Sequence, residues 1–294
     1  MSSVLGQRLS WQDACRRDWT SSEGLAELTN IVAPLLPFAP RPFQIKDSAC
    51  ILKGLDVFCV SATGDGKSAL IYIPALVCDG ITLVIEPTNF LQSSLHQYSG
   101  NLQKRGIKIL VINSETRHEA EGQRRNLWKE AAEGLYQVVA LSPELLRTAE
   151  FDVLVKTKSF RLKWTNLAVD ESHLTDEWGG DFRPLYEDIY SVRSRGPDHL
   201  CVIALSATVE PGPQTTRIMN HIGFRPKAHY LDRRDCERLN MAIIFRDVKF
   251  SFSGFIFWDI DWVIPVGIQS STDIPKTLLY CETIDLGHRV TTYL

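Results

Sequence analysis

The stretch from Val57 to Leu76, VFCVSATGDGKSALIYIPAL, places a glycine-rich turn between two apolar segments. Glycine lets the backbone turn tightly and point successive N–H groups into a concavity. The positive end of a helix that follows such a turn adds a further attraction for phosphate. The stretch therefore predicts a phosphate-binding loop between a buried strand, which ends at Ser61 or Ala62, and a helix that begins near Lys67.

Each polar residue of this loop has a predicted role. Lys67 would reach the β and γ phosphates of a nucleotide as a point charge, and the hydroxyl of Ser68 would bind Mg²⁺. The usual loop pattern begins with glycine five positions before Gly66, where this chain has Ser61, so the match is TGxGKS and not the full GxxxxGKS. The alternative is a glycine turn with a solvated lysine. The predicted nucleotide-binding residues of the loop are Thr63, Gly64, Asp65, Gly66, Lys67 and Ser68.

Short apolar runs recur along the chain, separated by polar or amphipathic spacers. Most runs are continuously apolar, which is typical of strands buried on both faces of a parallel sheet. Strands that alternate with helices predict a doubly wound α/β fold. The predicted strands are 56–62, 81–87, 107–113, 136–144, 166–171 and 201–208, and two spacers predicted to be amphipathic helices are 89–106 and 119–134.

The chain beyond residue 208 has a different character. Residues 209–275 are turn-rich and basic and include an aromatic stretch, and a strand over Thr277–Glu282 with a following helix is predicted to begin a second, incomplete α/β unit. The predicted divisions are an N-terminal leader over 1–30, a nucleotide-binding lobe over 31–225, a linker or insertion over 226–275, and the start of a second lobe over 276–294.

Composition narrows the class of protein without identifying it. The net charge of -3 gives no general argument for a nucleic-acid or anionic-membrane partner, so any such partner must be bound by local patches. No run reaches the roughly 18 apolar residues of a membrane helix, and the first thirty residues lack the apolar core of a signal peptide. The seven scattered cysteines form no CxxC pair. These features predict a soluble intracellular protein with reduced thiols and no membrane partner.

Two further strand ends carry polar groups. NLAVDESH (166–173) ends in carboxylates where ligands bind in open α/β sheets. Asp170 would hold Mg²⁺, Glu171 would orient or deprotonate the attacking water, and His173 would relay the state of the γ-phosphate. Ser206 and Thr208, in the SAT that closes another strand, would couple the nucleotide site to moving parts; the alternative is a strand-ending turn.

The order TGDGKS, DESH, SAT resembles the superfamily-two helicases, and more closely the RecQ-type DNA helicases. RPFQ is similar to that family's adenine-reading motif, in which Gln44 would bind the adenine edge and Arg41 would help fix the base. EPTNFLQ (86–92) is similar to the next motif, where Pro87 and Thr88 would touch the nucleic-acid backbone, and SPE (142–144) fits a further motif on the same side.

The stretch WGGDFRPLY (178–186) resembles the aromatic-rich loop that separates RecQ-type enzymes from other helicases. Trp178, Phe182 and Tyr186 offer faces on which unpaired bases would stack, at roughly 1–3 kcal/mol per base. Arg183 adds a cation for phosphate. The alternative is that these aromatic residues pack as a corner of the core. The basic runs 156–163 and 193–195 are candidates for phosphate contact or are solvated faces.

The resemblance covers about residues 36–235 and resumes at 277–294. It implies a RecA-like fold, ATP and Mg²⁺ as cofactors, single-stranded or forked DNA as partner, 3′–5′ polarity, and a nuclear role in DNA repair and recombination. The family's second-lobe motifs have no counterpart here, so the chain resembles a C-terminally truncated helicase whose ATP-binding lobe binds Mg-ATP and whose hydrolysis and unwinding are impaired. A separate second lobe or protein partner is left open.

Three other interpretations remain. The chain could be a non-catalytic, nucleotide-gated nucleic-acid-binding or interaction module, an RNA-directed helicase lobe, or an incomplete gene product. RPFQ and WGGDFRPLY favour DNA over RNA.

Overall fold

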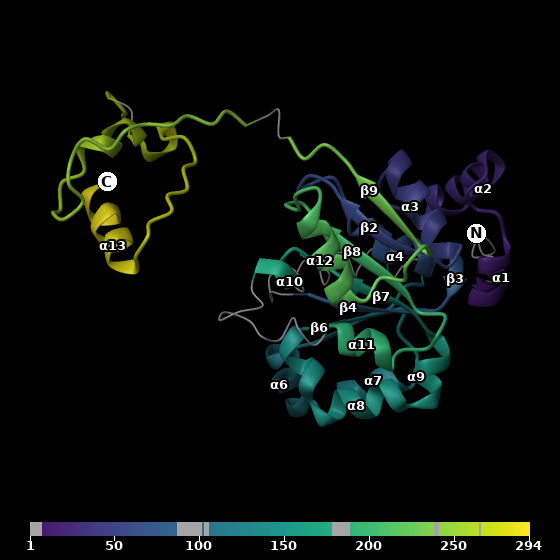
Figure 1. Ribbon diagram of the computed structural model, residues 1–294. Helices are drawn as coiled ribbons and strands as arrows, with labels where there is room; N and C mark the ends of the chain where they lie inside the picture. Colours follow the sequence, from purple (N-terminus) through teal and green to yellow (C-terminus); the bar gives the residue numbers. More distant parts are fainter. Residues whose placement is uncertain (1–7, 87–101, 103–105, 178–188, 238–240, 265) are drawn as a thin grey trace. The chain divides into compact units, whose positions relative to one another are not determined.

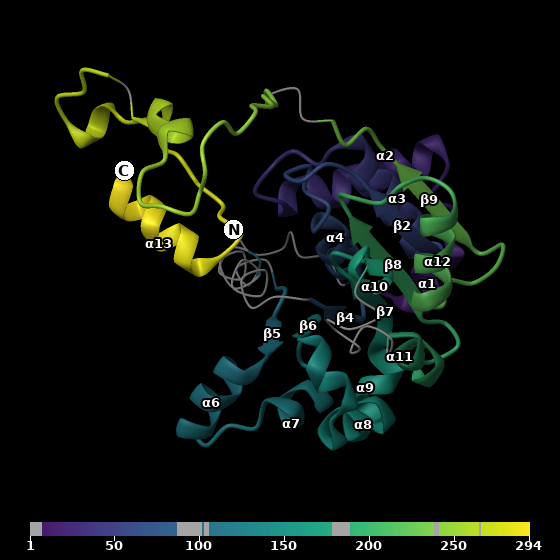
Figure 2. The ribbon, with the colours of Figure 1, turned by 60° about the vertical axis from the view of Figure 1, so that its left-hand side comes forward.

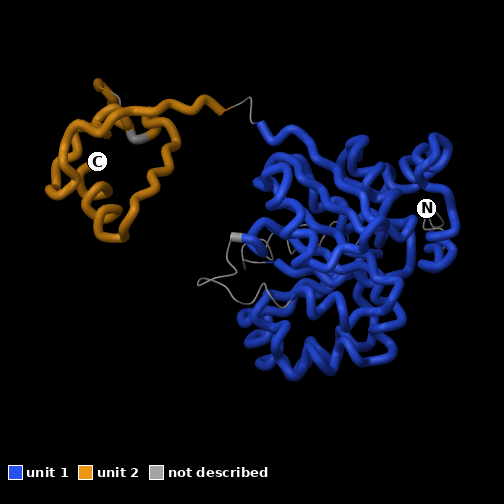
Figure 3. The backbone as a smooth tube through the Cα atoms, viewed as in Figure 1, with its two compact units in different colours: residues 1–238 blue, residues 239–294 orange. Residues whose placement is uncertain are grey.

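The computed structural model describes residues 8–86, 102, 106–177, 189–237, 241–264 and 266–294. The chain forms two compact units, residues 1–238 and 239–294 (Figure 3), which we describe separately. The predicted domain borders at 30, 225 and 275 stay a prediction.

Unit 1 is built on a seven-stranded sheet in which every neighbouring pair of strands is parallel. The spatial order is β5-β6-β4-β7-β8-β2-β9. Helices cover both faces of the sheet (Figures 1 and 2), which confirms the predicted doubly wound α/β class. The strands are β2 (Asp56–Val60), β4 (Ile81–Ile85), β5 (Ile109–Ile112), β6 (Val138–Leu141), β7 (Trp164–Val169), β8 (Cys201–Ser206) and β9 (His229–Arg233).

The two helical layers have separate apolar cores. One face of the sheet packs against α1 (Trp11–Arg16), α2 (Ser22–Val32), α3 (Pro42–Leu52) and α4 (Ala69–Val77). The other face packs against α6 (Ser114–Gly122), α7 (Leu127–Ala132), α8 (Ala149–Lys156), α9 (Lys158–Lys163), α10 (Leu174–Glu177), α11 (Ile189–Arg195) and α12 (Pro213–Ile222).

The burial of both faces of β2 explains why most of its residues are apolar. Val57 and Cys59 lie in the core under α1–α4, whereas Phe58 and Val60 lie in the core on the opposite face. Successive side chains of a strand point to opposite faces, so a strand covered on both sides has no solvated position. The same argument holds for β4, β7 and β8, all of whose residues are buried.

The first helices belong to the core of unit 1. Trp11, Trp19, Leu28 and Val32 are buried in the cluster under α1–α4. The indole Nε1 of Trp19 donates a hydrogen bond to the carbonyl of Ala14 at 2.8 Å, which satisfies its polar atom inside the core. A two-residue strand β1 (Leu9–Ser10) also pairs with β3 (Cys78–Asp79).

Some local predictions are corrected by the structure. The helix predicted over 119–134 is two helices, α6 and α7, because the chain turns between them, with Arg124 at φ 56°. The strand β9 falls in the predicted linker over 226–275; its mostly polar, partly exposed sequence HYLDR suits an edge strand and gives no continuous apolar run. The phosphate-loop helix begins at Ala69, after a turn at Lys67 and Ser68.

Unit 2 lacks the predicted strand over Thr277–Glu282. These residues have no regular structure, and Leu278 and Tyr280 are exposed. A strand needs a partner for its backbone groups, and the described residues of unit 2 contain no other strand. The helix predicted after it is present as α13 (Ile284–Tyr293), and a 3₁₀ turn, η4, spans Trp258–Val263.

A buried ion pair joins the start of β2 to the loop before β9. The carboxylate of Asp56 is fully buried and accepts hydrogen bonds from the backbone N–H groups of Val202 (2.9 Å) and Arg225 (2.8 Å). The guanidinium of Arg225 donates to both carboxylate oxygens, at 3.2 and 3.0 Å. Arg193 lies 3.6 Å from the same carboxylate. These contacts tie together β2, β8, α11 and the segment that leads into β9.

All seven cysteines are free thiols, and four of them are buried. Among the described residues, no helix is both long enough and apolar enough to cross a bilayer.

Candidate functional site

The site lies where the parallel strands end. The carboxyl ends of β2, β4 and β7 lead into Ser61, Glu86 and Asp170, and β8 ends at Ser206, two residues before Thr208. Parallel strands end at one edge of a sheet, so segments far apart in sequence meet there. We call this edge the carboxyl edge.

The loop after β2 turns at two glycines. Gly64 and Gly66 have φ values of 88° and 82°, in the left-handed region that favours glycine. A Cβ at Gly66 would also lie 2.8 Å from Nε2 of Gln44. The second glycine therefore meets both a conformational and a steric requirement.

Lys67 lies inside this turn. Its Nζ donates hydrogen bonds to the carbonyls of Ser61 (2.8 Å) and Ala62 (3.2 Å), at the end of β2. Its positive charge also acts on Asp170 and Glu171, where it opposes the effect of burial on their pKa values. The amine therefore lies within electrostatic range of the two carboxyl groups at the carboxyl edge.

The predicted adenine-reading residues contact the same loop. Gln44, on α3, donates from Nε2 to the carbonyl of Gly66 at 2.8 Å and accepts from the N–H of Arg41 at 2.8 Å. Arg41 forms an ion pair with Asp65 at 2.6 Å. The first turn of α3 therefore holds the loop from one side. Thr63 and Ser68 are exposed on the loop.

The acidic residues after β7 have an unusual backbone. Oδ1 of Asp170 accepts a hydrogen bond from the N–H of Glu171 at 2.9 Å. Glu171 has φ 47°, a conformation that is uncommon for a residue other than glycine and that occurs often at functional sites. Burial, with the Glu171 charge adding to it, raises the pKa of Asp170 to about 6. Burial also raises the pKa of Glu171.

His173 joins the two remaining motifs. Its Nδ1 lies 2.9 Å from Oγ of Ser206 and 3.3 Å from Oε2 of Glu171. The same Ser206 Oγ accepts a hydrogen bond from the N–H of Thr208 at 3.3 Å. The structure therefore brings the DESH and SAT segments into direct contact, as a side-chain path from the carboxylates to β8.

Glu86 belongs to this site and was missed by sequence reasoning. It follows β4 directly and is buried, and its Oε2 has no hydrogen-bond partner among the residues that the structure describes. Burial, with the Asp170 charge adding to it, raises the pKa of Glu86 to about 8. The available signal was an acid closing the apolar run ITLVIE, the same signal that singled out Asp170.

The donor set at the carboxyl edge fits a Mg²⁺ ion. Carboxylate, hydroxyl and water oxygens are its preferred ligands, and Glu86, Asp170 and Ser68 would supply them. Oε2 of Glu86 has no hydrogen-bond partner among the described residues, and the charge of Asp170 acts on Glu86, so a bound cation would favour the ionised form of both carboxyl groups.

We expect a Glu86→Gln variant to be more stable than the wild type at pH 9 and about equally stable at pH 4. Because the pKa of Glu86 is raised in the folded state to about 8, the folded state binds its proton more tightly than the unfolded state. The free energy of unfolding therefore falls as pH rises from the unfolded value to the folded one. Glutamine cannot ionise, so the gain at pH 9 should be about 2–4 kcal/mol.

Denaturant unfolding without divalent cations, at a series of pH values, measures this difference. Glu121→Gln, on the exposed side of α6, is the matched control and should show no gain that grows with pH. Equal stability of Glu86→Gln and wild type at pH 9 would contradict the prediction.

The predicted nucleic-acid residues lie outside the described part of the chain. This applies to Pro87, Thr88, Trp178, Phe182, Arg183 and Tyr186. The basic runs 156–163 and 193–195 are described, and their arginines make internal contacts. Arg161 donates to the carbonyls of Arg195 and Gly196, and Arg195 pairs with Asp152. These arginines thus have structural partners on α8 and around the end of α11.

Comparison with known proteins places these features in a family. The DEAD/DEAH box helicase profile matches residues 41–216. The chain is 34% identical over 184 residues to the ATP-dependent DNA helicase RecQ of Haemophilus influenzae, covering 63% of this chain and 28% of that protein. It is 35% identical over 176 residues to the ATP-dependent helicase SGS1 of Saccharomyces cerevisiae, covering 57% of this chain and 12% of that protein.

The fold has solved counterparts. The DUF1998 helicase MrfA, in its crystal structure bound to DNA and AMPPNP, superposes with a TM-score of 0.52 at 15% identity, over 75% of this chain and 30% of MrfA. The likeness concerns the fold. The chain spans less than a third of the length of each relative described here.

Proposed function

This chain belongs to the DEAD/DEAH box helicase family and is of the RecQ type, and on that premise we propose that it binds Mg-ATP and single-stranded DNA as the ATP-binding lobe of an ATP-dependent 3′–5′ DNA helicase. The observation that carries the proposal is the position of the Lys67 amine. It lies inside a glycine turn and acts electrostatically on both Asp170 and Glu171.

Binding is assigned to the loop and the first turn of α3. The amine of Lys67 now bonds to the carbonyls of Ser61 and Ala62, and a triphosphate would offer it stronger, charge-assisted acceptors. Backbone N–H groups around Asp65 would take the remaining phosphate oxygens. Arg41 and Gln44 contact the same loop and would orient the base.

Hydrolysis is assigned to the residues after β7. Mg²⁺, when bound, neutralises charge that develops on the phosphate oxygens, and Ser68 and Asp170 would hold it. Glu171 would orient the attacking water and accept its proton. His173 would transmit the state of the γ-phosphate to Ser206 and Thr208. Its Nδ1 contacts Oγ of Ser206, and that oxygen accepts a hydrogen bond from the N–H of Thr208.

We propose that these 294 residues alone bind ATP well and hydrolyse it slowly. In two-lobe motors an arginine from the facing lobe contributes roughly 10³–10⁵ in rate, and the sequence contains no motif that we assign to that role. Stepping along a strand requires two lobes that close and reopen around the nucleotide. Nuclear location and roles in repair and recombination remain predictions.

DNA is the proposed partner on two grounds. The relatives from H. influenzae and from Bacillus subtilis are named DNA helicases, the latter 35% identical over 153 residues. The aromatic residues at 178, 182 and 186 would supply stacking faces for unpaired bases.

We expect a Lys67→Ala variant to bind Mg-ATP about 10–100-fold more weakly than the wild type, because charge-assisted hydrogen bonds are worth about 1.5–3 kcal/mol. Titration of a fluorescent ATP analogue into the purified chain with excess Mg²⁺ measures the two dissociation constants.

Lys129→Ala, which removes an exposed lysine of α7, is the control and should leave the dissociation constant unchanged. A wild type that does not bind the analogue, or equal affinities of wild type and Lys67→Ala, would refute the proposed function.

A further inference from the structure

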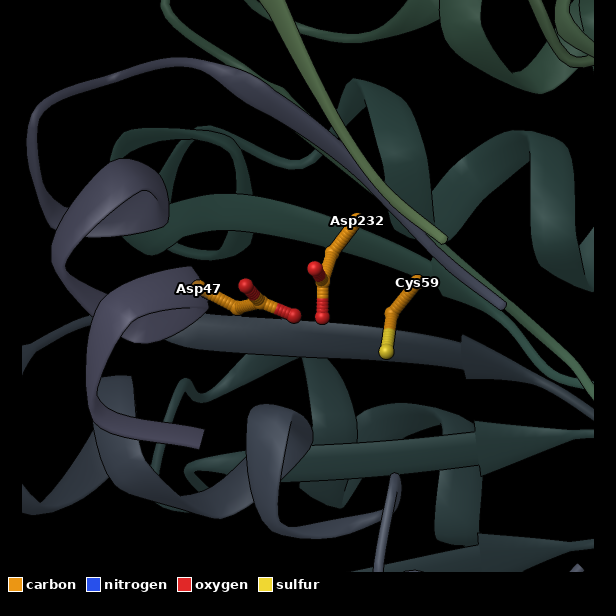
Figure 4. A group of neighbouring side chains, drawn as sticks. All are labelled: Asp47, Cys59 and Asp232. Atoms are coloured by element: carbon orange, nitrogen blue, oxygen red, sulfur yellow. The ribbon is translucent and has the colours of Figure 1, made fainter. Parts of the chain in front are cut away.

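Three potential metal ligands that the proposed nucleotide site does not use meet within unit 1, near the carboxyl ends of β2 and β9. Asp47 on α3, Cys59 on β2 and Asp232 on β9 point toward a common centre (Figure 4), and one ligand atom from each lies within 4.8 Å of the others. None of the three was singled out by the motifs of the sequence.

The fold builds this cluster from strand register and helix packing. Cys59 and Asp232 are register partners in the parallel pair β2–β9, so their side chains project side by side from one face of the sheet. Helix α3 packs on that face and directs Asp47 onto them. The cluster depends on the register of the edge strand β9 against β2 and on the packing of α3, so no local sequence pattern predicts it.

Within the described part of the chain, the acidic groups have few partners. Asp47 is fully buried, and its carboxylate has no hydrogen-bond partner there other than the thiol of Cys59; Oδ2 of Asp232 has none. Two neighbouring cations offset the burial only in part: the charges of Lys46 and Arg234 lower the pKa of Asp47. Lys46 also lies 5.2 Å from the ring centre of Tyr230, and Arg234 lies 4.5 Å from that of Phe43.

Such a cluster is costly without a cation. Burial, with the charge of Asp232 adding to it, raises the pKa of Asp47 to about 7. Burial also raises the pKa of the Cys59 thiol. An unpaired buried acid is normally tolerated only when it is protonated or bound to a metal.

We propose that Asp47, Cys59 and Asp232 form a binding site for one divalent transition-metal ion of the zinc type. The donor set of one sulfur and two carboxylate oxygens suits Zn²⁺, whereas Mg²⁺ and Ca²⁺ bind through oxygen alone. The half-buried Asp232 leaves a route for the ion and a fourth position for water. On binding, the thiol loses its proton to solvent and sulfur bonds to the ion as thiolate.

The site would fasten the edge of the sheet. Among the described strands, β9 pairs with β2 alone, and a metal would cross-link these two strands and α3. The N–H of Arg234 bonds to the carbonyl of Val60 at 2.8 Å, at the last residue of β2, so the link would lie close to the phosphate loop that follows. The site shares no ligand with the proposed Mg²⁺ site and does not rest on nucleotide binding.

Zinc binding by the purified 294-residue chain tests the proposal. After removal of metals with a chelator, the chain is titrated with Zn²⁺ in competition with a chromophoric chelator. We expect one ion per chain, with affinity lowered more than about 100-fold in Cys59→Val and in Asp47→Asn, because loss of a residue that merely supports a metal ligand already costs roughly 10–100-fold.

Cys78→Ala is the matched control, since it removes another buried thiol that is not in the cluster. Cys59→Val keeps an apolar, β-favouring side chain in a buried strand, and circular dichroism checks its fold. Co²⁺ in place of Zn²⁺ gives a second readout, a thiolate charge-transfer absorption that we expect in the wild type and in Cys78→Ala and not in Cys59→Val.

Two results would overturn the proposal. One is a wild type that retains no stoichiometric Zn²⁺ and whose thermal unfolding temperature does not change when Zn²⁺ is added. A proton shared between Asp47 and Asp232 would then explain how the cluster is tolerated. The other is equal binding by Cys59→Val and Cys78→Ala, which would place the ion elsewhere.

Discussion

A Glu171→Gln variant should hydrolyse ATP about 10²–10⁴-fold more slowly than the wild type, the range that a general base contributes. Glutamine keeps the shape of the side chain and can still hold a water molecule, but it cannot accept the proton of that water. Glu171 lies 3.3 Å from His173 and is within the electrostatic reach of Lys67. Of the other carboxyl groups described at this edge, Asp170 is proposed to hold the metal, and the pKa of Glu86 is raised to about 8, so neither is expected to replace Glu171 as the base.

Phosphate release under single-turnover conditions, with single-stranded DNA present, measures this effect even if the wild-type rate is low. Nucleotide affinity should stay nearly unchanged, which separates Glu171→Gln from Lys67→Ala. Glu150→Gln, at an exposed position of α8, is the control. If the chain were a non-catalytic, nucleotide-gated module, Glu171→Gln and wild type would behave alike, and the helicase assignment of Glu171 would fail.

Asp56→Asn should lower the free energy of unfolding of unit 1 by about 3–5 kcal/mol, the cost of breaking a buried ion pair by removing one partner. The fully buried carboxylate of Asp56 accepts two backbone N–H bonds and the guanidinium of Arg225. Asparagine removes the negative charge and turns an NH₂ group toward donors. Arg225 and Arg193 would then remain without a counter-charge near β2.

Guanidinium chloride unfolding, followed by far-ultraviolet circular dichroism, measures this loss as a lower midpoint. Glu27→Gln is the control because it breaks the surface pair with Arg17, whose side chains are 50% and 43% exposed. An exposed ion pair contributes up to about 1 kcal/mol to the free energy of unfolding. A loss in Asp56→Asn no larger than in Glu27→Gln would show that the buried pair does not hold β2 and β9 together.

The central strands could be predicted from sequence because both of their faces are buried. Five apolar residues in succession, as in β2 or β4, leave no face for water, and the covered parallel sheet follows. β9 could not be predicted in this way. Its residues His229–Arg233 are only partly buried, and it joins the sheet through backbone pairing with β2.

The strand predicted at 277–282 shows the opposite error. Its residues favour a strand locally, but pairing is not a local property, and the described residues of unit 2 offer no partner. The break between α6 and α7 is similar: the apolar spacing over 119–134 suits a helix, whereas the backbone turns at Arg124.

The loop and the acids were recognisable because each residue type has a chemical requirement. Gly66 needs a positive φ, and Lys67 and Asp170 bear charges at strand ends. Sequence could not show that Gln44 bonds to the loop itself, or that His173 touches Ser206. Glu86 escaped notice because its significance depends on a neighbouring strand.

The presence of the central buried strands and their approximate positions along the chain, and the chemistry of the phosphate loop, could be predicted from the sequence alone, since periodicity and backbone conformation act over a few residues. The tertiary structure decided which polar groups share a space. The carboxyls of Glu86 and Asp170 meet because β4 and β7 are adjacent, and the cluster of Asp47, Cys59 and Asp232 exists because β9 pairs with β2 in one register beneath α3. The electrostatic energy of such groups depends on distances through space, which spacing along the chain does not specify.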